Sequence, residues 1–110
     1  MGVLGTHSCV FAQTIVDGKN YGNNCFMVQI RDLDSHRAMK GIEVGDIGPK
    51  FGFQSKDNGY AIFTNVRIPR THILKRYLNV SLEGKVKRLG NPLILYSIMM
   101  FTRLEVMSAS

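Results

Sequence analysis

The stretch Ser8-Cys-Val-Phe-Ala-Gln-Thr-Ile-Val16, followed by Asp17-Gly18 and later by Cys25-Phe-Met-Val-Gln-Ile30, indicates a β-fold. β-branched and aromatic residues dominate the first stretch, and these residue types favour extended strands. Asp-Gly is typical of tight hairpin turns, because both residue types tolerate a positive φ. In the second stretch apolar residues occupy alternate positions, as in a strand with one buried face. We therefore expect strands over 8–16 and 25–30, with the polar segment 20–24 as a loop.

Similar signals continue along the next part of the chain. Asp57-Asn58-Gly59 is the clearest turn, and Pro69 ends the apolar run after it because proline lacks an N–H donor. Further extended segments are expected at 42–47, 51–53, 60–68, 80–82 and 85–86, the last two joined by Glu83-Gly84. Short strands at this spacing favour an antiparallel sandwich or barrel. The predicted fold class is therefore all-β, with one C-terminal helix.

That helix is predicted over Leu93–Met107, a run of good helix formers without Gly or Pro. Asn91 is a suitable N-cap, and Pro92 suits the first helical turn. Apolar residues cover nearly the whole circumference, and such helices are normally buried. We therefore expect the isolated chain to self-associate through Leu93–Met107, or this helix to fray. One short turn of helix is also expected over His72–Tyr77, capped by Thr71.

The composition is that of a single globular domain with an excess of basic residues. Of 110 residues, 45% are apolar and 20% charged, and the formal net charge is +6. A basic protein favours anionic partners. The Lys and Arg residues are not interleaved with aromatic residues, so solvated surface charge is favoured over a nucleic-acid-binding face. No signal peptide or membrane span is expected, because no apolar run has the required length or flanks.

Few residues could carry chemistry by themselves. Cys9 and Cys25 lie in apolar runs without metal-ligand neighbours, so two core thiols are favoured over a disulfide and no metal site is expected. None of the three histidines lies near a Ser or Cys in a known nucleophile arrangement, and all are expected in turns or on the surface. They are His7, His36 and His72. Asp32 and Asp34 stand in a polar segment and are interpreted as turn formers before acid–base groups.

Two glycine-dense segments leave alternatives open. Gly2-Val3-Leu4-Gly5-Thr6 could present backbone N–H groups to an anion, although it lacks the Gly-Lys-Ser/Thr of a P-loop. In residues 45–52, Gly-Asp-Ile-Gly-Pro-Lys-Phe-Gly, the glycines either relieve crowding where strands bend or let the backbone approach a flat cofactor.

Four segments, in order and spacing, resemble the peroxisomal acyl-CoA oxidases within the wider acyl-CoA dehydrogenase group. They are Val10-Phe-Ala-Gln13 through Asp17-Gly-Lys-Asn-Tyr-Gly22, Phe26-Met-Val-Gln-Ile-Arg-Asp32, Val44-Gly-Asp-Ile-Gly-Pro-Lys-Phe-Gly52, and Asp57-Asn-Gly-Tyr60 leading to Val66-Arg-Ile-Pro-Arg70. The resemblance extends from about His7 to Leu89. Its third segment points to oxidases rather than dehydrogenases.

The resemblance implies that 1–90 form the middle β-domain, a flattened antiparallel barrel or sandwich of two sheets, and that 91–110 begin a truncated C-terminal helical domain. In that family FAD lies between the two domains, and fatty acyl-CoA is oxidised to trans-2-enoyl-CoA with release of hydrogen peroxide in peroxisomal β-oxidation. The family's catalytic glutamate falls after this chain ends, so no catalytic residue is expected here. The fragment alone is expected to be inactive and not to retain FAD.

The resemblance also suggests which glycines would contact the flavin. The family has a Trp-Trp-x-Gly-x-x-Gly-type segment whose first glycine touches the flavin, whereas this sequence has no Trp. If the alignment allows a short deletion before His7, Gly2 matches the flavin-contacting glycine and Gly5 matches the second glycine of the motif. Without that deletion, Gly2 matches the second glycine and the flavin-contacting one is absent. Gly2 and Gly5 are therefore the candidate cofactor-binding residues.

Candidates for binding the CoA phosphates follow only from the net charge and the anionic ligand, and they are Lys50, Arg67 and Arg70. Two other readings of the chain remain: the middle domain of an acyl-CoA dehydrogenase, which passes electrons to a flavoprotein, and a non-enzymatic basic β-barrel binding module.

Overall fold

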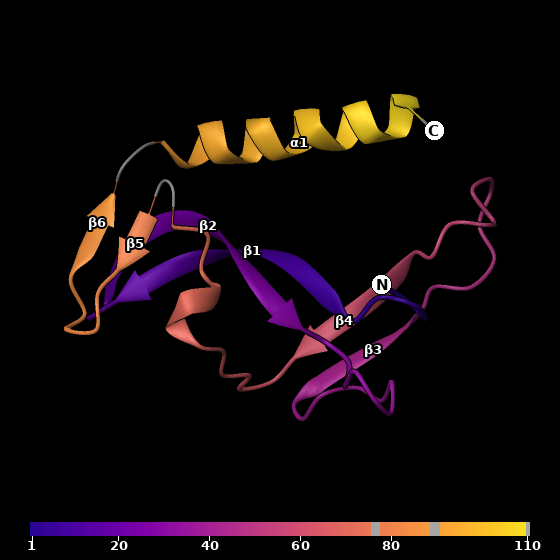
Figure 1. Ribbon diagram of the computed structural model, residues 1–110, viewed down its shortest axis with the longest axis horizontal. Coiled ribbons are helices and arrows are strands. Elements are labelled where there is room, and N and C mark those ends of the chain that lie inside the picture. The colour runs from indigo at the N-terminus through magenta and orange to yellow at the C-terminus, as the bar shows by residue number, and fades with distance from the viewer. Residues whose placement is uncertain (76–77, 89–90, 110) are drawn as a thin grey trace. The chain divides into compact units, whose positions relative to one another are not determined.

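The structure, a computed structural model, describes residues 1–75, 78–88 and 91–109 (Figure 1). The chain divides into two compact units, Met1–Val10 with Met27–Pro69 and Phe11–Phe26 with Arg70–Ser110. The described strands form three two-stranded sheets, β1 with β2, β3 with β4 and β5 with β6, and a single long helix follows them. The predicted all-β class with one C-terminal helix is confirmed.

The longest strands are β1 (His7–Val16) and β2 (Lys19–Gln29), joined by a two-residue turn. Asp17 and Gly18 in this turn have φ values of 50° and 76°, the combination that matches the twist of a tight hairpin. The predicted loop over 20–24 is wrong, because these residues belong to β2. Asn24 explains the error: its Oδ1 accepts a hydrogen bond from the Cys25 amide at 2.9 Å, so a polar residue is accommodated inside the sheet.

In the first unit β3 (Ile42–Asp46) and β4 (Gly59–Phe63) pair antiparallel, with Gly45 opposite Tyr60. A Cβ atom on Gly45 would lie 2.5 Å from the Tyr60 ring. Packing across the strand pair therefore accounts for this glycine of the 45–52 segment.

Two extended segments predicted in this unit are corrected. The strand expected over 60–68 ends at Phe63, and Asn65 beyond it has a φ of 50°. The extended piece expected over 51–53 is not formed, because Gly52 and Phe53 have φ values of 90° and 52° and the chain bends at 51–52. At Asn65 and Phe53, which are not glycine, a positive φ turns the chain out of the extended conformation, and residue propensity alone does not reveal it.

The second unit contains a 3₁₀ turn, η1 (Arg70–His72), and the hairpin of β5 (Leu78–Val80) and β6 (Val86–Arg88). The hairpin predicted around Glu83-Gly84 is confirmed, with strand ends shifted by a few residues. The helix predicted over His72–Tyr77 is wrong in its described part, and its last two residues, 76 and 77, lie outside the described residues.

Pairing with β2 is what displaces that helix. Ile73 forms a bridge with Phe26, and the amide of Leu74 donates to the Cys25 carbonyl at 3.0 Å. The backbone groups that an α-helix needs are therefore bonded to a strand from far earlier in the chain.

The helix α1 (Pro92–Ala109) confirms the prediction over Leu93–Met107. The Asn91 side chain accepts a hydrogen bond from the Leu93 amide at 2.9 Å, as expected of an N-cap. The ring of Tyr96 meets Phe11 of β1 edge-on at 5.5 Å between centroids. Along the described residues, no helix has the length and apolar character that crossing a membrane requires.

Each unit has a small core. Within the described part of the chain, the buried apolar residues of the first unit are Val28, Ile30 and Ile42, and those of the second are Cys25, Ile73 and Leu78. Of the two thiols expected in the core, Cys25 is buried but Cys9 is exposed, because alternate residues of β1 face opposite ways.

Truncating the core should destabilise the first unit strongly. The Ile30 side chain is 0% exposed, so Ile30→Ala should leave a cavity and lower the free energy of unfolding by about 3 kcal/mol. Leu33→Ala is the matched control, because Leu33 is 66% exposed, and its effect should stay below about 0.5 kcal/mol. Urea unfolding followed by circular dichroism measures both. Equal losses in the two variants would contradict this assignment of the core.

Candidate functional site

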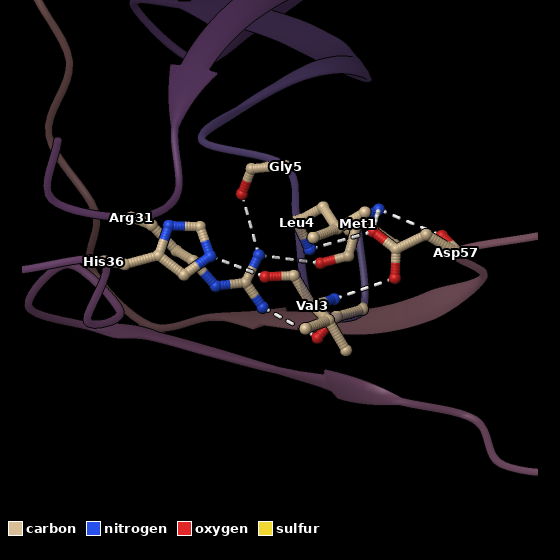
Figure 2. Close-up of polar contacts among 8 residues, drawn as sticks. Met1, Val3, Leu4, Gly5, Arg31, His36 and Asp57 are labelled. Carbon is tan, nitrogen blue, oxygen red and sulfur yellow. Dashed lines mark hydrogen bonds and ion pairs between the residues drawn. The ribbon is translucent and has the colours of Figure 1, made fainter.

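The segment Met1–Thr6 is held by the guanidinium of Arg31, two residues after the end of β2 (Figure 2). Arg31 is 6% exposed. Its Nη1 donates to the carbonyl oxygens of Met1 and Gly5 at 2.9 and 2.7 Å, and its Nη2 donates to that of Gly2 at 2.7 Å. A planar guanidinium suits this role, because its donors point outward in fixed directions and can gather several acceptors at once.

Asp57 holds the opposite, N–H side of the same segment (Figure 2). Its carboxylate accepts the amides of Val3 and Leu4 at 2.8 and 3.0 Å, and the Met1 amino group at 2.8 Å. The hydrogen bond from the Met1 amino group and that from the Leu4 amide lower the pKa of Asp57 to about 2. The carboxylate is therefore ionised at neutral pH and keeps these donors bound.

A turn after β2 adds a third contact. His36, with a φ of 59°, places its Nε2 2.6 Å from the Val3 carbonyl oxygen. Asp32 closes the turn: its Oδ2 accepts the amide of Ser35 at 2.8 Å, and this bond lowers the pKa of Asp32 below its ordinary value of 3.8. The interpretations of Asp32 as a turn former and His36 as a turn histidine are confirmed.

The segment expected to offer its amides to an anion thus gives two of them to the chain's own Asp57. Gly2 is buried, and a Cβ atom there would lie 2.8 Å from the Asn58 carbonyl oxygen, so only glycine fits without a shift. Gly5 is half-buried, whereas the Leu4 side chain between them is 74% exposed. The segment therefore exposes an apolar side chain on a backbone that Arg31 and Asp57 hold in place.

The three basic candidates lie in different settings. Lys50 is half-buried and Arg67 exposed, and both belong to the first unit. Arg70 belongs to the second unit, where its Nη1 donates to the Val80 carbonyl oxygen at 2.8 Å and so ties η1 to β5. Within the described residues, no group of three or more His, Cys, Asp or Glu side chains could hold a metal ion.

Sequence reasoning missed Arg31 and Asp57 as the residues that fix Met1–Thr6. The available signal was a charged residue that directly follows an alternating apolar run, since Ile30 precedes Arg31. A buried charge needs partners, and in this unit backbone carbonyls supply them. Sequence alone does not say which carbonyls, because the acceptors lie more than twenty residues away.

No protein-family model matches the chain. Curated relatives do match. Peroxisomal acyl-coenzyme A oxidase 1 of Dictyostelium discoideum is 41% identical over 116 residues, covering 100% of this chain and 17% of the relative. The human protein of the same name is 46% identical over 104 residues, covering 94% of this chain and 16% of the relative. The chain therefore spans about one sixth of the length of these relatives.

Solved structures agree. An acyl-CoA oxidase from tomato is 42% identical with a TM-score of 0.82, over 98% of this chain and 17% of that one. Acyl-CoA oxidase-2 of Caenorhabditis elegans, solved bound with FAD, ascaroside-CoA and ATP, is 42% identical with a TM-score of 0.83, over 87% of this chain and 14% of that one.

The hold of Asp57 on Met1–Thr6 should depend on pH. Its folded pKa of about 2 lies below the ordinary value of 3.8, so this contribution is complete above about pH 4 and is lost as the pH falls towards 2. The amide shifts of Val3 and Leu4 in NMR spectra should titrate with a midpoint near 2. In Asp57→Asn these transitions should be absent, whereas Asp34→Asn should leave them unchanged. A midpoint at or above the ordinary value would contradict the assignment.

Proposed function

Because the chain is homologous, over nearly its whole length, to one segment of the peroxisomal acyl-CoA oxidases, we propose that it is the middle β-domain of an FAD-dependent acyl-CoA oxidase. The observation that carries the proposal is a sequence identity of 41–46% to two of these oxidases across 94–100% of the chain. Proteins that share only a fold commonly have a much lower sequence identity. The names of the relatives support a peroxisomal location by family.

The proposed role is to form one wall of the flavin and acyl-CoA site. Residues 1–90 would be the β-domain and 91–110 the start of a helical domain that completes the site. Bound FAD would supply the acceptor for the hydride removed from the acyl chain, with oxygen as the final acceptor and hydrogen peroxide as product. The catalytic base would come from outside this chain, so the chain by itself is inactive.

The Met1–Thr6 segment is the proposed flavin-facing element, with Gly2 and Gly5 as its cofactor-binding residues. The proposed contact between this segment and the flavin is apolar rather than polar. The Val3 and Leu4 amides are already bound to Asp57, and three carbonyls of the segment are bound to Arg31. These bonds would keep the segment in one conformation, so it would not have to become ordered when cofactor binds.

A segment exchange tests the proposal. The matching segment of the tomato oxidase, 42% identical, is replaced by this chain, and FAD content, oxygen consumption and peroxide release with a fatty acyl-CoA are measured. The hybrid should bind FAD and release peroxide, whereas the isolated chain should do neither. A folded hybrid that retains FAD but reduces only an artificial acceptor would indicate a dehydrogenase segment. A folded hybrid without FAD would overturn the proposal.

The same hybrid tests the CoA contacts proposed for Lys50, Arg67 and Arg70. Lys50→Glu and Arg67→Glu should each raise KM for acyl-CoA by roughly fivefold with kcat little changed, as expected for loss of a charge contact to phosphate. Lys56→Glu, an exposed lysine outside the proposed set, is the control and should leave KM unchanged. Unchanged KM in Lys50→Glu and Arg67→Glu would remove these residues from the proposed site. Arg70 is left intact because it also bonds Val80.

We also propose that the isolated chain self-associates through α1. The Ser97 and Thr102 hydroxyls donate to carbonyls of the same helix, so these polar side chains are turned to their own backbone. Among the helix side chains that the structure describes, the exposed apolar ones are Leu93, Ile94, Tyr96, Ile98, Met100, Phe101, Leu104, Val106 and Met107. An uncovered apolar surface of this kind is rare on monomers.

Light scattering of the isolated chain across a concentration series should show species larger than a monomer. The double variant Phe101→Glu with Leu104→Glu should shift the distribution to monomer, because burying two carboxylates is costly. Leu82→Glu is the matched control: Leu82 is 88% exposed but lies in the β5–β6 turn, so the distribution should not change. A monodisperse monomer with an ordered helix would refute self-association.

A further inference from the structure

The backbone of Met1–Thr6 lies directly against the strand pair β3–β4. A Cβ atom on Gly59 of β4 would lie 2.3 Å from the Gly2 Cα atom and 2.5 Å from the Gly45 carbonyl oxygen. Gly59 has no positive φ, so this close approach, and not the backbone conformation, is what requires glycine there. The segment is therefore seated on the sheet, backbone against backbone.

Two side chains from different parts of the first unit hold the segment on this seat (Figure 2). Arg31 follows β2 and donates to three carbonyl oxygens of the segment, at 2.9, 2.7 and 2.7 Å. Asp57 precedes β4 and accepts two amides of the segment, at 2.8 and 3.0 Å. A guanidinium can only donate and a carboxylate can only accept, so neither side chain can take over the bonds of the other.

Both side chains are occupied by the segment itself. Arg31 is buried, and its Nη1 and Nη2 atoms both donate to carbonyls of the segment. Asp57 is half-buried, and each of its carboxylate oxygens accepts an amide, Oδ1 from Val3 and Oδ2 from Leu4. Any effect of Arg31 or Asp57 on a ligand must therefore pass through the backbone that they hold.

We propose that Arg31 and Asp57 are positioning residues of the cofactor site, which set where Gly2 and Gly5 lie against the flavin and do not touch it. The inference rests on the proposed function, in which Met1–Thr6 faces the flavin. A binding residue must be held within about 0.5 Å of its productive position, and here two ionised side chains hold the backbone before any ligand binds. When the segment is displaced in part of the molecules, the apparent affinity for FAD falls with the fraction in which it is in place.

Amide hydrogen exchange in the full chain, without cofactor, tests the hold on the segment. Arg31→Lys keeps the positive charge but offers one nitrogen in place of the two that share three carbonyls. The Val3 and Leu4 amides should then exchange roughly tenfold faster although Asp57 is unchanged, because the segment leaves its seat more often. Arg37→Lys, at an exposed arginine in the turn after β2, is the matched control and should leave both exchange rates unchanged.

The affinity of the segment-exchange hybrid for FAD tests the positioning role. Arg31→Lys and Asp57→Asn should each raise the Kd for FAD roughly tenfold, and the flavin absorption band should shift towards that of free FAD. The double variant should lose little more than either single variant, because both residues hold the same segment. Gly59→Ala leaves both side chains in place but fills the seat of Gly2, so it should weaken FAD binding too.

Ile42→Ala is the control for stability alone. Ile42 is a buried residue of the same unit, so its truncation lowers the free energy of unfolding without removing a bond to the segment. Under conditions in which circular dichroism shows every hybrid to be folded, its Kd for FAD should match that of the unaltered hybrid. An equal loss of affinity in Ile42→Ala would reduce Arg31 and Asp57 to structural residues and overturn the inference.

Unchanged FAD affinity in the folded Arg31→Lys and Asp57→Asn hybrids would also overturn it. The oxidase assignment would then stand, because the unaltered hybrid would still bind FAD and release peroxide. If Arg31→Lys does not fold, Asp57→Asn and Gly59→Ala decide the question. A roughly hundredfold loss in the double variant, the product of two independent losses, would contradict action through one segment. An unaltered hybrid that folds without FAD would refute the proposed function and the positioning role with it.

Discussion

A buried guanidinium must find acceptors, and in the first unit that requirement decides where Met1–Thr6 lies. Removing a charge from water costs several kcal/mol unless hydrogen bonds replace the lost hydration. Arg31 at 6% exposure meets the requirement with the carbonyls of Met1, Gly2 and Gly5. Once the carbonyls turn to Arg31, the Val3 and Leu4 amides face the other way, and Asp57 binds them. Two opposite charges thus fix one short segment from its two sides.

This polar arrangement matters because the apolar core is small. Among the described residues, three apolar side chains are buried in each unit, while a long helix and the 47–53 region expose large apolar ones. A chain that buries so little apolar surface gains little from the hydrophobic effect. The same exposed apolar surface supports the proposal that further domains cover this chain in an oxidase. The length of the relatives supports it too, because this chain matches only about one sixth of them.

Local signals predicted most of the elements. The Asp17-Gly18 turn, the β5–β6 hairpin and the Asn91-capped helix depend on residues close in sequence, where turn chemistry and capping act directly. The errors occurred where a distant partner changed the outcome. Pairing of Ile73 with Phe26 replaced a helical turn, and the hydrogen bond from Asn24 to the Cys25 amide kept a polar segment inside β2. Asn65 and Phe53 ended extended runs by adopting positive φ, which residue type does not reveal.

The sequence by itself determined the class of fold, the C-terminal helix and the similarity to one enzyme family, because periodicity, turn residues and contiguous motifs are local properties of the chain. Only the tertiary structure decided the contacts. It joined Arg31 and Asp57 to the two sides of Met1–Thr6. The physical reason is that hydrogen bonds and charges act over a few ångströms in space, whatever the separation along the chain.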